Sequence, residues 1–299
     1  ALCTGDSVNA DCPVCGAVGA DLTACKGLEA QPATLSNALP ATALAAAPEN
    51  QVIYVGGKEV TSGGYWTTDS AGNVTAYTGG DTPTDNYIHY DAANNTLTLH
   101  NATIKKQLDY SENIEGGTYI FGSAIGVFNQ NGAAELTITL EGANTIAEVG
   151  KGIFVLASST STGGATLNIT GDGSLDASAS QTGIWVQSNS GNAALTIQNA
   201  KVEATGTSAA GYGVNVQSSQ SSTASLTVDG GSLTASGAPG ILYDSIGSGT
   251  VPNTTALTIS NSAIVDARNG EIGAGSTTNL QPVPPSGNGI VFNGDEGTV

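Results

Sequence analysis

The feature that most constrains the fold of this chain is an internal repeat that runs from about residue 95 to residue 292. One half of each repeat is a short run with apolar residues at alternate positions. The leading leucines of these runs, spaced 39, 31, 28, 31 and 31 residues apart, are Leu97, Leu136, Leu167, Leu195, Leu226 and Leu257. The other half reads AIGV (124–127), GIFV (152–155), GIWV (183–186), GVNV (213–216), GILY (240–243) and GIVF (289–292). A period near 30 residues, with alternation inside each run, indicates stacked strand-built repeats.

Each half of the repeat has the pattern of a strand. Side chains alternate between the two faces of a strand, so Leu195 and Ile197 share one face of the run ALTI. In the same way Ile184 and Val186 share one face of GIWV, and Trp185 lies on the other. These runs therefore predict one inward and one outward face for every repeat.

A third strand completes the repeat. Val202 and Ala204 follow Leu195 by seven and nine residues, and the later repeats have the same spacing. Three strands and three turns use about 30 residues, which is one coil of a parallel β-helix. We therefore predict an all-β, parallel β-helix (a solenoid) of about six coils, wound right-handed as parallel connections generally are. The alternative is an antiparallel sandwich, which does not require in–out–in triplets at this period.

The composition argues against several classes of protein. The chain has 25 Asp and Glu residues against 7 Lys and Arg, a net charge of −18, and 41 glycines. Such an acidic chain is poorly suited to phosphate backbones, so we expect no nucleic-acid partner. It contains no apolar run of the roughly 18 residues that a membrane helix needs, so we expect no membrane span.

All four cysteines lie in the first 25 residues, at Cys3, Cys12, Cys15 and Cys25. Their clustering in an otherwise cysteine-free chain predicts a small module with two disulfides in an oxidising, extracellular setting. Four thiolates around zinc are the alternative, although zinc ribbons usually bring two C-x2-C pairs and only CPVC is present here.

The composition divides the chain into four predicted parts. Residues 1–28 form the Cys-rich module, and residues 29–50 form an extended arm rich in alanine and proline. Residues 51–94, with Gly-Gly and Asn-rich turns, form a small β cap over the first coil of the β-helix at 95–299. The arm is unusually apolar for a linker, with Leu35, Leu39 and Leu44 available to lie against another surface.

Two stretches carry a resemblance to known proteins. IYVGGKEVTSGGYW, followed by YIHYDAANNTLTLHNATI, resembles the start of secreted β-helix proteins of gut-type Gram-positive bacteria. ITGDGSLDASASQTGIWV is similar to the carbohydrate-binding β-helix family that includes clostridial pectin-binding proteins. The likeness spans about residues 51–267 and implies a location outside the cell or on its surface. That family carries acidic residues beside its GI positions to serve calcium, and TGIWV, YGVNV, PGILY and NGIVF have none, so we expect no metal and no cofactor.

The sequence contains few candidate catalytic residues. His89 and His100 lie on predicted strands and are expected to face solvent. Arg268, beside Asp266 and Glu271, is the one candidate for a lyase-type base, and a surface ion pair is the simpler interpretation.

Carboxylate pairs for glycoside hydrolysis could be Asp172 with Asp176, or Asp109 with Glu112, but both pairs lie in turn-like sequence. No HExxH, GxSxG or phosphate-loop motif occurs. We therefore expect a protein that is not an enzyme.

The outward positions differ between the two halves of the repeat. The leucine runs present a polar ladder of Thr98, Thr137, Asn168, Thr196, Thr227 and Thr258. The other runs present an apolar stripe of Phe154, Trp185, Leu242 and Val291, interrupted by Gly126 and Asn215. An exposed apolar stripe of this kind marks a covered or binding surface.

Two functions fit these features. The first is a structural or adhesive surface subunit that associates with copies of itself, through the arm and the stripe, into an oligomer or fibre. The second is a polysaccharide-binding module with aromatic platforms at Trp66, Tyr65 and Trp185, although aromatic packing inside the cap explains the first two equally well.

Overall fold

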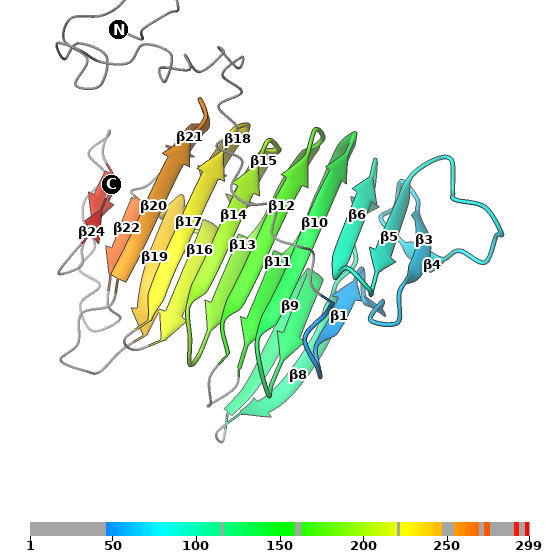
Figure 1. The fold of residues 1–299 in the computed structure, drawn as a ribbon, viewed down its shortest axis with the longest axis horizontal. Coiled ribbons are helices and arrows are strands. Elements are labelled where there is room, and N and C mark those ends of the chain that lie inside the picture. The colour runs from blue at the N-terminus through cyan, green and yellow to red at the C-terminus, as the bar shows by residue number, and fades with distance from the viewer. Residues whose placement is uncertain are drawn as a thin grey trace, which may run out of the picture. The chain divides into compact units, whose positions relative to one another are not determined.

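The structure is a computed structural model that describes residues 46–114, 117–158, 163–219, 222–246, 254–268, 272–275, 290–292 and 297–298. For residues 109–114, 117–121, 244–246 and those after 268 it describes the backbone alone. The Cys-rich module and Leu35, Leu39 and Leu44 lie outside the described residues. Within the described residues the chain is all-β and contains no helix (Figure 1).

The strands form two sheets. The ten-stranded sheet contains β3 (Gly64–Thr68), β4 (Val74–Ala76), β5 (Tyr87–Asp91), β6 (Thr96–His100), β10 (Ala134–Glu141), β12 (Ala165–Gly171), β14 (Ala193–Gln198), β17 (Thr223–Asp229), β20 (Thr254–Ser260) and β24 (Gly297–Thr298). Its strand order is β24-β20-β17-β14-β12-β10-β6-β5-β3-β4. The leucine runs of the repeat are the parallel strands of this sheet.

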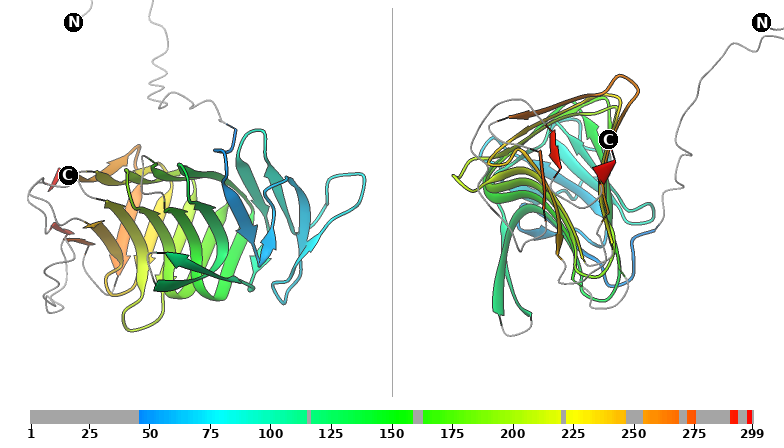
Figure 2. Two further views of the ribbon diagram at one scale, coloured as in Figure 1. Left: turned by 90° about the horizontal axis from the view of Figure 1, so that it is seen from below. Right: turned by 90° about the vertical axis from the view of Figure 1, so that its left-hand side faces the viewer.

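The fourteen-stranded sheet has two parts. Its main path contains β2 (Lys58–Glu59), β1 (Val52–Val55), β9 (Gly117–Asn129), β11 (Ala143–Ala157), β13 (Ser174–Ser188), β16 (Tyr212–Ser219), β19 (Ile241–Ile246), β22 (Ile272–Gly275) and β23 (Ile290–Phe292). Its other strands are β7 (Thr103–Ile104), β8 (Leu108–Ile114), β15 (Lys201–Gly206), β18 (Ser232–Ser236) and β21 (Ile264–Arg268). The long strands β11 and β13 belong to both parts, so they bend and provide two sides of a three-sided turn (Figure 2).

One turn shows how the sequence pattern becomes a core. Leu195 and Ile197 of β14, Val202 and Ala204 of β15 and Val214 of β16 are all buried in one hydrophobic cluster. They lie at alternate positions of three strands, which brings three rows of apolar side chains to the same axis. Full burial of one such Leu, Ile or Val side chain stabilises the fold by roughly 1.5–3 kcal/mol.

Stacking in register extends these rows from turn to turn. Leu167, Leu195, Leu226 and Leu257 pair with one another in parallel along the ten-stranded sheet. The four turns between residues 134 and 246 have parallel neighbours on both sides. The predicted parallel solenoid is therefore confirmed, with about four turns, whereas the predicted number of six coils is not confirmed.

The turn after five of the parallel strands of the ten-stranded sheet, β6, β10, β14, β17 and β20, begins with a residue of uncommon backbone conformation. Asn101, Gly142, Asn199, Gly230 and Asn261 each follow such a strand, and their φ angles lie between 48° and 70°. Glycine adopts this left-handed region freely, and asparagine tolerates it better than other residues. The repeat of Asn and Gly at this position thus ends these five strands at the same corner, whereas β12 ends on Gly171, whose φ is 112°.

Antiparallel strands lie at the N-terminal end of the stack. β5 pairs with β6, and β1 pairs with β9, so the first parallel strand of each sheet has an antiparallel neighbour. In Figure 1 β1 and β5, drawn in blue and cyan, stand at one end of the row of green and yellow strands. An antiparallel sandwich is excluded for the repeat region, because the strands formed by the leucine runs pair with one another in parallel.

Two details of the repeat differ from the prediction. Leu97 pairs with Ile138, two residues beyond the expected Leu136, so Thr98 aligns with Thr139 in place of Thr137. The 39-residue spacing there includes the antiparallel pair β8–β9, an insertion that the other turns lack. In addition, β22 lies between β19 and β23, where the predicted repeat has no strand.

Candidate functional site: two aromatic surfaces

The outer face of the ten-stranded sheet carries a row of rings that we call the ring ladder: Tyr65, Tyr87, His89 and His100. Tyr65 stacks on His89 with ring centroids 4.1 Å apart, and Tyr87 stacks on His100 at 4.7 Å. The two stacks meet edge-on, with the centroids of Tyr65 and Tyr87 5.9 Å apart. All four side chains are half-buried, so part of each ring stays in contact with solvent.

Alternation along three neighbouring strands creates this ladder. Trp66 in β3 and Ile88 in β5 face the core, so Tyr65, Tyr87 and His89 face outward. The register then sets Tyr65 opposite His89, and Tyr87 opposite His100 of β6. Cross-strand neighbours of this kind lie about 5 Å apart, close enough for rings to stack.

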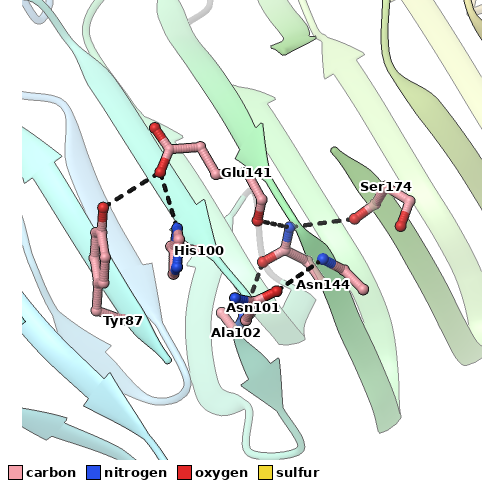
Figure 3. Close-up of polar contacts among 8 residues, drawn as sticks. Tyr87, His100, Asn101, Ala102, Glu141, Asn144 and Ser174 are labelled. Carbon is pink, nitrogen blue, oxygen red and sulfur yellow. Dashed lines mark hydrogen bonds and ion pairs between the residues drawn. The ribbon is translucent and has the colours of Figure 1, made fainter. Parts of the chain in front are cut away.

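A carboxylate ends the ladder on the next strand. Tyr87 Oη donates to Glu141 Oε2 at 3.3 Å, and His100 Nδ1 lies 3.0 Å from the same oxygen (Figure 3). Burial, and after it the negative charge of Glu141, raises the pKa of the Tyr87 phenol above its ordinary value. The site therefore combines apolar ring surface with one acceptor oxygen that its own hydroxyl and imidazole groups hold in position.

Side-chain amides fix the corner that carries Glu141. Asn144 Nδ2 donates to the Glu141 carbonyl and to the Ser174 carbonyl, both at 3.2 Å (Figure 3). Asn144 Oδ1 accepts from the Ala102 amide at 2.8 Å, and Asn101 Oδ1 accepts from an amide of the same corner at 3.0 Å. These bonds join three successive turns and so fix the backbone of the corner beside Glu141, the last residue of the ladder's polar end.

The predicted platform residues divide between core and surface. Trp66 is 7% exposed and belongs to the main hydrophobic core, so the prediction of a Trp66 platform is wrong. Its place follows from alternation, because Trp66 shares the inward face of β3 with Thr68. Tyr65 does face outward, and it packs on His89, which the strand pattern indicated as an ordinary solvent-facing residue.

The predicted apolar stripe lies on the outer face of the fourteen-stranded sheet, but its side chains are less exposed than the sequence predicts. Gly126, Phe154, Trp185, Asn215 and Leu242 align in register, as the repeat predicts. Gly273 of β22 lies between Leu242 and Val291, so those two are not neighbours. The side chain of Val291 lies outside the described part of the chain.

Most of this stripe is packed within the chain. Phe154 is 1% exposed, so it does not form part of an open strip, and Trp185 and Leu242 are half-buried. Phe128, Phe154 and Leu156 form a second hydrophobic cluster, against which Tyr54 and Trp185 pack. We call this group the outer cluster. Register alone placed Phe154 outward, but only neighbouring side chains could bury it there.

A buried cation lies on the outer cluster. Lys151 is 6% exposed, and its Nζ lies 5.4 Å from the ring centroids of both Phe154 and Trp185. No carboxylate lies within ion-pair distance of it among the described side chains. Burial lowers the pKa of the Lys151 amine. Cation–π contacts of this kind offset part of the cost of burial, by about 0.5–2 kcal/mol.

Other polar atoms on this face are also buried without a hydrogen-bond partner in the described part of the chain. They are Ser123 Oγ, Trp185 Nε1 and Asn215 Oδ1. Each such atom costs about 1–3 kcal/mol when it stays unsatisfied. Three of them beside one buried lysine is an unusual concentration on a single face.

Among the described side chains, the remaining sequence candidates do not assemble into a site. Arg268 Nε pairs with Asp266 Oδ2 at 2.7 Å on the surface, as the simpler interpretation expected. Asp176 lies opposite Glu203 of the next turn, and burial, followed by the charge of Glu203, raises the pKa of its carboxyl. Asp172 is exposed.

The side chains of Asp109 and Glu112, the residue Glu271 and the four cysteines lie outside the described part of the chain. No group of three or more His, Cys, Asp or Glu side chains that could hold a metal ion occurs among the described residues. Nor does this part of the chain contain a helix long and apolar enough to cross a membrane.

Comparisons with known proteins return no relative for this chain. No protein-family model, no curated protein and no solved structure matches it. Its function is therefore inferred from the fold and from the two aromatic surfaces.

Proposed function

We propose that this protein is a non-catalytic, extracellular β-solenoid that binds a neutral polysaccharide along the outer face of its ten-stranded sheet. The observation that carries the proposal is the ring ladder, four half-buried rings from three adjacent strands. Aromatic side chains with a polar tip suit such contacts, because the ring packs on apolar C–H surface while the tip hydrogen-bonds.

Polar groups continue from the ladder along the sheet. Thr98 aligns with Thr139, which aligns with Thr170, and all three are half-buried on the outer face. Their hydroxyl groups can both donate and accept hydrogen bonds, as sugar hydroxyls do. This row supports an extended ligand that crosses several strands in preference to a single compact one.

Charge favours a neutral glycan over an acidic one. The chain carries a net charge of −18, and the ladder ends at Glu141 with no lysine or arginine among its rings. A polyuronate would meet repulsion both from the whole chain and from this carboxylate. The pectin-type ligand implied by the family resemblance is therefore the less suitable one.

The test is binding of the full chain to neutral polysaccharides and to polygalacturonate, by affinity electrophoresis and calorimetry. We expect binding to a neutral polymer that Tyr65→Ala with Tyr87→Ala weakens at least about tenfold, with unchanged circular dichroism. Tyr212→Ala, a half-buried tyrosine of the other sheet, is the matched control. Unchanged affinity in the double variant, or binding of polygalacturonate alone, would exclude the proposal.

Self-association into an oligomer or fibre is a second candidate, and a different surface favours it. Ile259 in β20 is 45% exposed and Ile264 in β21 is 65% exposed, at the C-terminal end of the described turns. β21 pairs with β18 and with no other described strand, so one edge remains available for a further strand. Sedimentation velocity of the wild type and of Ile264→Lys tests this: a concentration-dependent oligomer that the variant loses supports it, and a monomer at every concentration excludes it.

The finer features of the fold are also part of the proposal. We propose that β1–β5 act as a cap on a right-handed solenoid of six coils, because solenoid ends otherwise expose their apolar rows.

The Cys-rich module with its two disulfides, or a zinc ion in their place, remains a prediction from the sequence. Intact-mass measurement with and without reductant decides between disulfides and free thiols.

A further inference from the structure

A second group of polar side chains lies on the outer face of the fourteen-stranded sheet, away from the ring ladder. Lys151 and Ser123 are register partners on β11 and β9, and Trp185 and Asn215 are register partners on β13 and β16. A Cβ atom at Gly126 would lie 2.8 Å from Ser123 Oγ, so that hydroxyl lies over the row Gly126–Phe154–Trp185–Asn215. Lys151 and Ser123 lie three residues before this row on their strands, but Lys151 Nζ reaches the rings of Phe154 and Trp185. The four polar groups thus come from two register rows on four neighbouring strands.

Their chemistry is complementary to a specific kind of ligand. Lys151 Nζ, Ser123 Oγ and Trp185 Nε1 can all donate hydrogen bonds, and Lys151 adds a positive charge. Asn215 Oδ1 is an acceptor, and it lies one strand beyond Trp185. Three donors, one of which is the Lys151 cation, suit a carboxylate. The Asn215 acceptor, one strand further on, suits a hydroxyl group of the ligand.

The surroundings explain why this site would select a carboxylate in an acidic protein. Lys151 is one of seven basic residues in the chain and has no carboxylate partner in the described part. The rings of Phe154 and Trp185 lie beside its ammonium group, and this apolar surface strengthens the attraction of an incoming anion. A charged partner would also satisfy donors that are otherwise buried and unsatisfied.

We propose that Lys151, Ser123, Trp185 and Asn215 form a binding site for a small polyhydroxylated carboxylate, a sugar acid in chemical class. The carboxylate would lie between Lys151 and the Trp185 indole N–H, and a hydroxyl of the ligand would donate to Asn215. The site is on a different sheet from the ring ladder, so it does not depend on polysaccharide binding there.

The experiment follows the indole N–H signals of the wild-type chain by ¹⁵N–¹H NMR as sodium gluconate is added at constant ionic strength. The chain has two tryptophans, and Trp66 in the core serves as the internal reference. We expect a saturable shift of the Trp185 signal alone, no shift with sorbitol, and roughly five- to tenfold weaker binding of acetate, which lacks the hydroxyl groups.

Variants separate the site from a general salt effect. Lys151→Met keeps the length and packing of the side chain and should abolish the shift, whereas Lys201→Met, at an exposed lysine, should leave it unchanged. Asn215→Leu provides a second variant if Lys151→Met does not fold, and it should weaken gluconate while leaving acetate unaffected. No saturable shift with gluconate, or the same shift with sorbitol or in Lys151→Met, would overturn the proposal.

The same titration on the Tyr65→Ala, Tyr87→Ala double variant keeps the two proposals apart. Gluconate binding that survives in this variant shows that the Lys151 site acts independently of the ring ladder. Loss of gluconate binding there, with the fold intact, would overturn the assignment of the ligand to the fourteen-stranded sheet.

Discussion

His100 Nδ1 and Glu141 Oε2 lie 3.0 Å apart although 41 residues separate them in the chain. The pair exists because β6 and β10 are stacked in parallel, with His100 directly opposite Glu141. Tyr87 donates to the same carboxylate oxygen from β5, so one acid joins three adjacent strands. The most specific polar feature of the ring ladder is thus a product of stacking.

Replacement of this acid tests its effect on the neighbouring phenol. We expect Glu141→Gln to lower the pKa of Tyr87 part of the way back toward 10.0, because the negative charge is lost while burial, the larger cause, remains. An ultraviolet or NMR titration of the phenol measures this, with Glu203→Gln on another side of the solenoid as the control. An unchanged Tyr87 titration would show that Glu141 does not act on the phenol in solution.

The core prediction concerns Leu195, which is buried between Leu167 and Leu226 of the adjacent turns. Leu195→Ala should lower the free energy of unfolding by roughly 2–5 kcal/mol, since it removes apolar contacts and leaves a cavity. Thr196→Ala, at the adjacent outward position, should change it by no more than about 0.5 kcal/mol. Urea denaturation followed by circular dichroism gives both values, and equal losses would contradict the inward row.

The buried amide side chain of Asn144, at the start of β11, has a role that the strand pattern does not reveal. Asn144→Ala leaves the buried Ala102 amide and two carbonyls without their partner, so we expect a loss of about 1–3 kcal/mol. Asn189→Ala, at an exposed asparagine, is the matched control and should be nearly neutral. Thermal denaturation compares the two, and a stable Asn144→Ala variant would show that water replaces these bonds.

Alkaline pH should weaken the fold through Tyr90. Burial raises the pKa of its phenol from 10.0 to about 12, and the hydroxyl donates to Asn95 Oδ1 at 2.9 Å. The folded state thus keeps a proton that the unfolded state releases, so this contribution to stability is complete below about pH 10 and is lost as the pH rises toward 12. At about 1.4 kcal/mol per pKa unit, the loss is on the order of 2–3 kcal/mol.

Tyr90→Phe should reduce this pH dependence, at the cost of about 1 kcal/mol at neutral pH for the lost hydrogen bond. It removes part of the dependence and not all of it, because burial also raises the pKa of Tyr243. Urea denaturation between pH 8 and pH 12, with Tyr212→Phe as the control, is the measurement. An identical pH profile for Tyr90→Phe and the wild type would rule out this role.

The periodic apolar positions determined the fold class without any structure. A strand in which Leu195 and Ile197 alternate with Thr196 can bury one face only, and a repeat near 30 residues supplies the next turn that covers it. The same alternation placed Trp185 outward between Ile184 and Val186, and the structure confirms that register. Local periodicity was sufficient here because the side-chain period of a strand is fixed by its backbone.

Tertiary structure decided which outward residues stay exposed and which polar groups meet. Phe154 faces outward as predicted, yet Phe128 and Trp185 pack against it, because residues separated by a whole turn become neighbours about 5 Å apart. Trp66 lies in the core and not on the predicted platform, because it shares the inward face of β3 with Thr68. Pairing across turns depends on the register and on insertions such as β8–β9, and neither is visible in the periodicity of a single run.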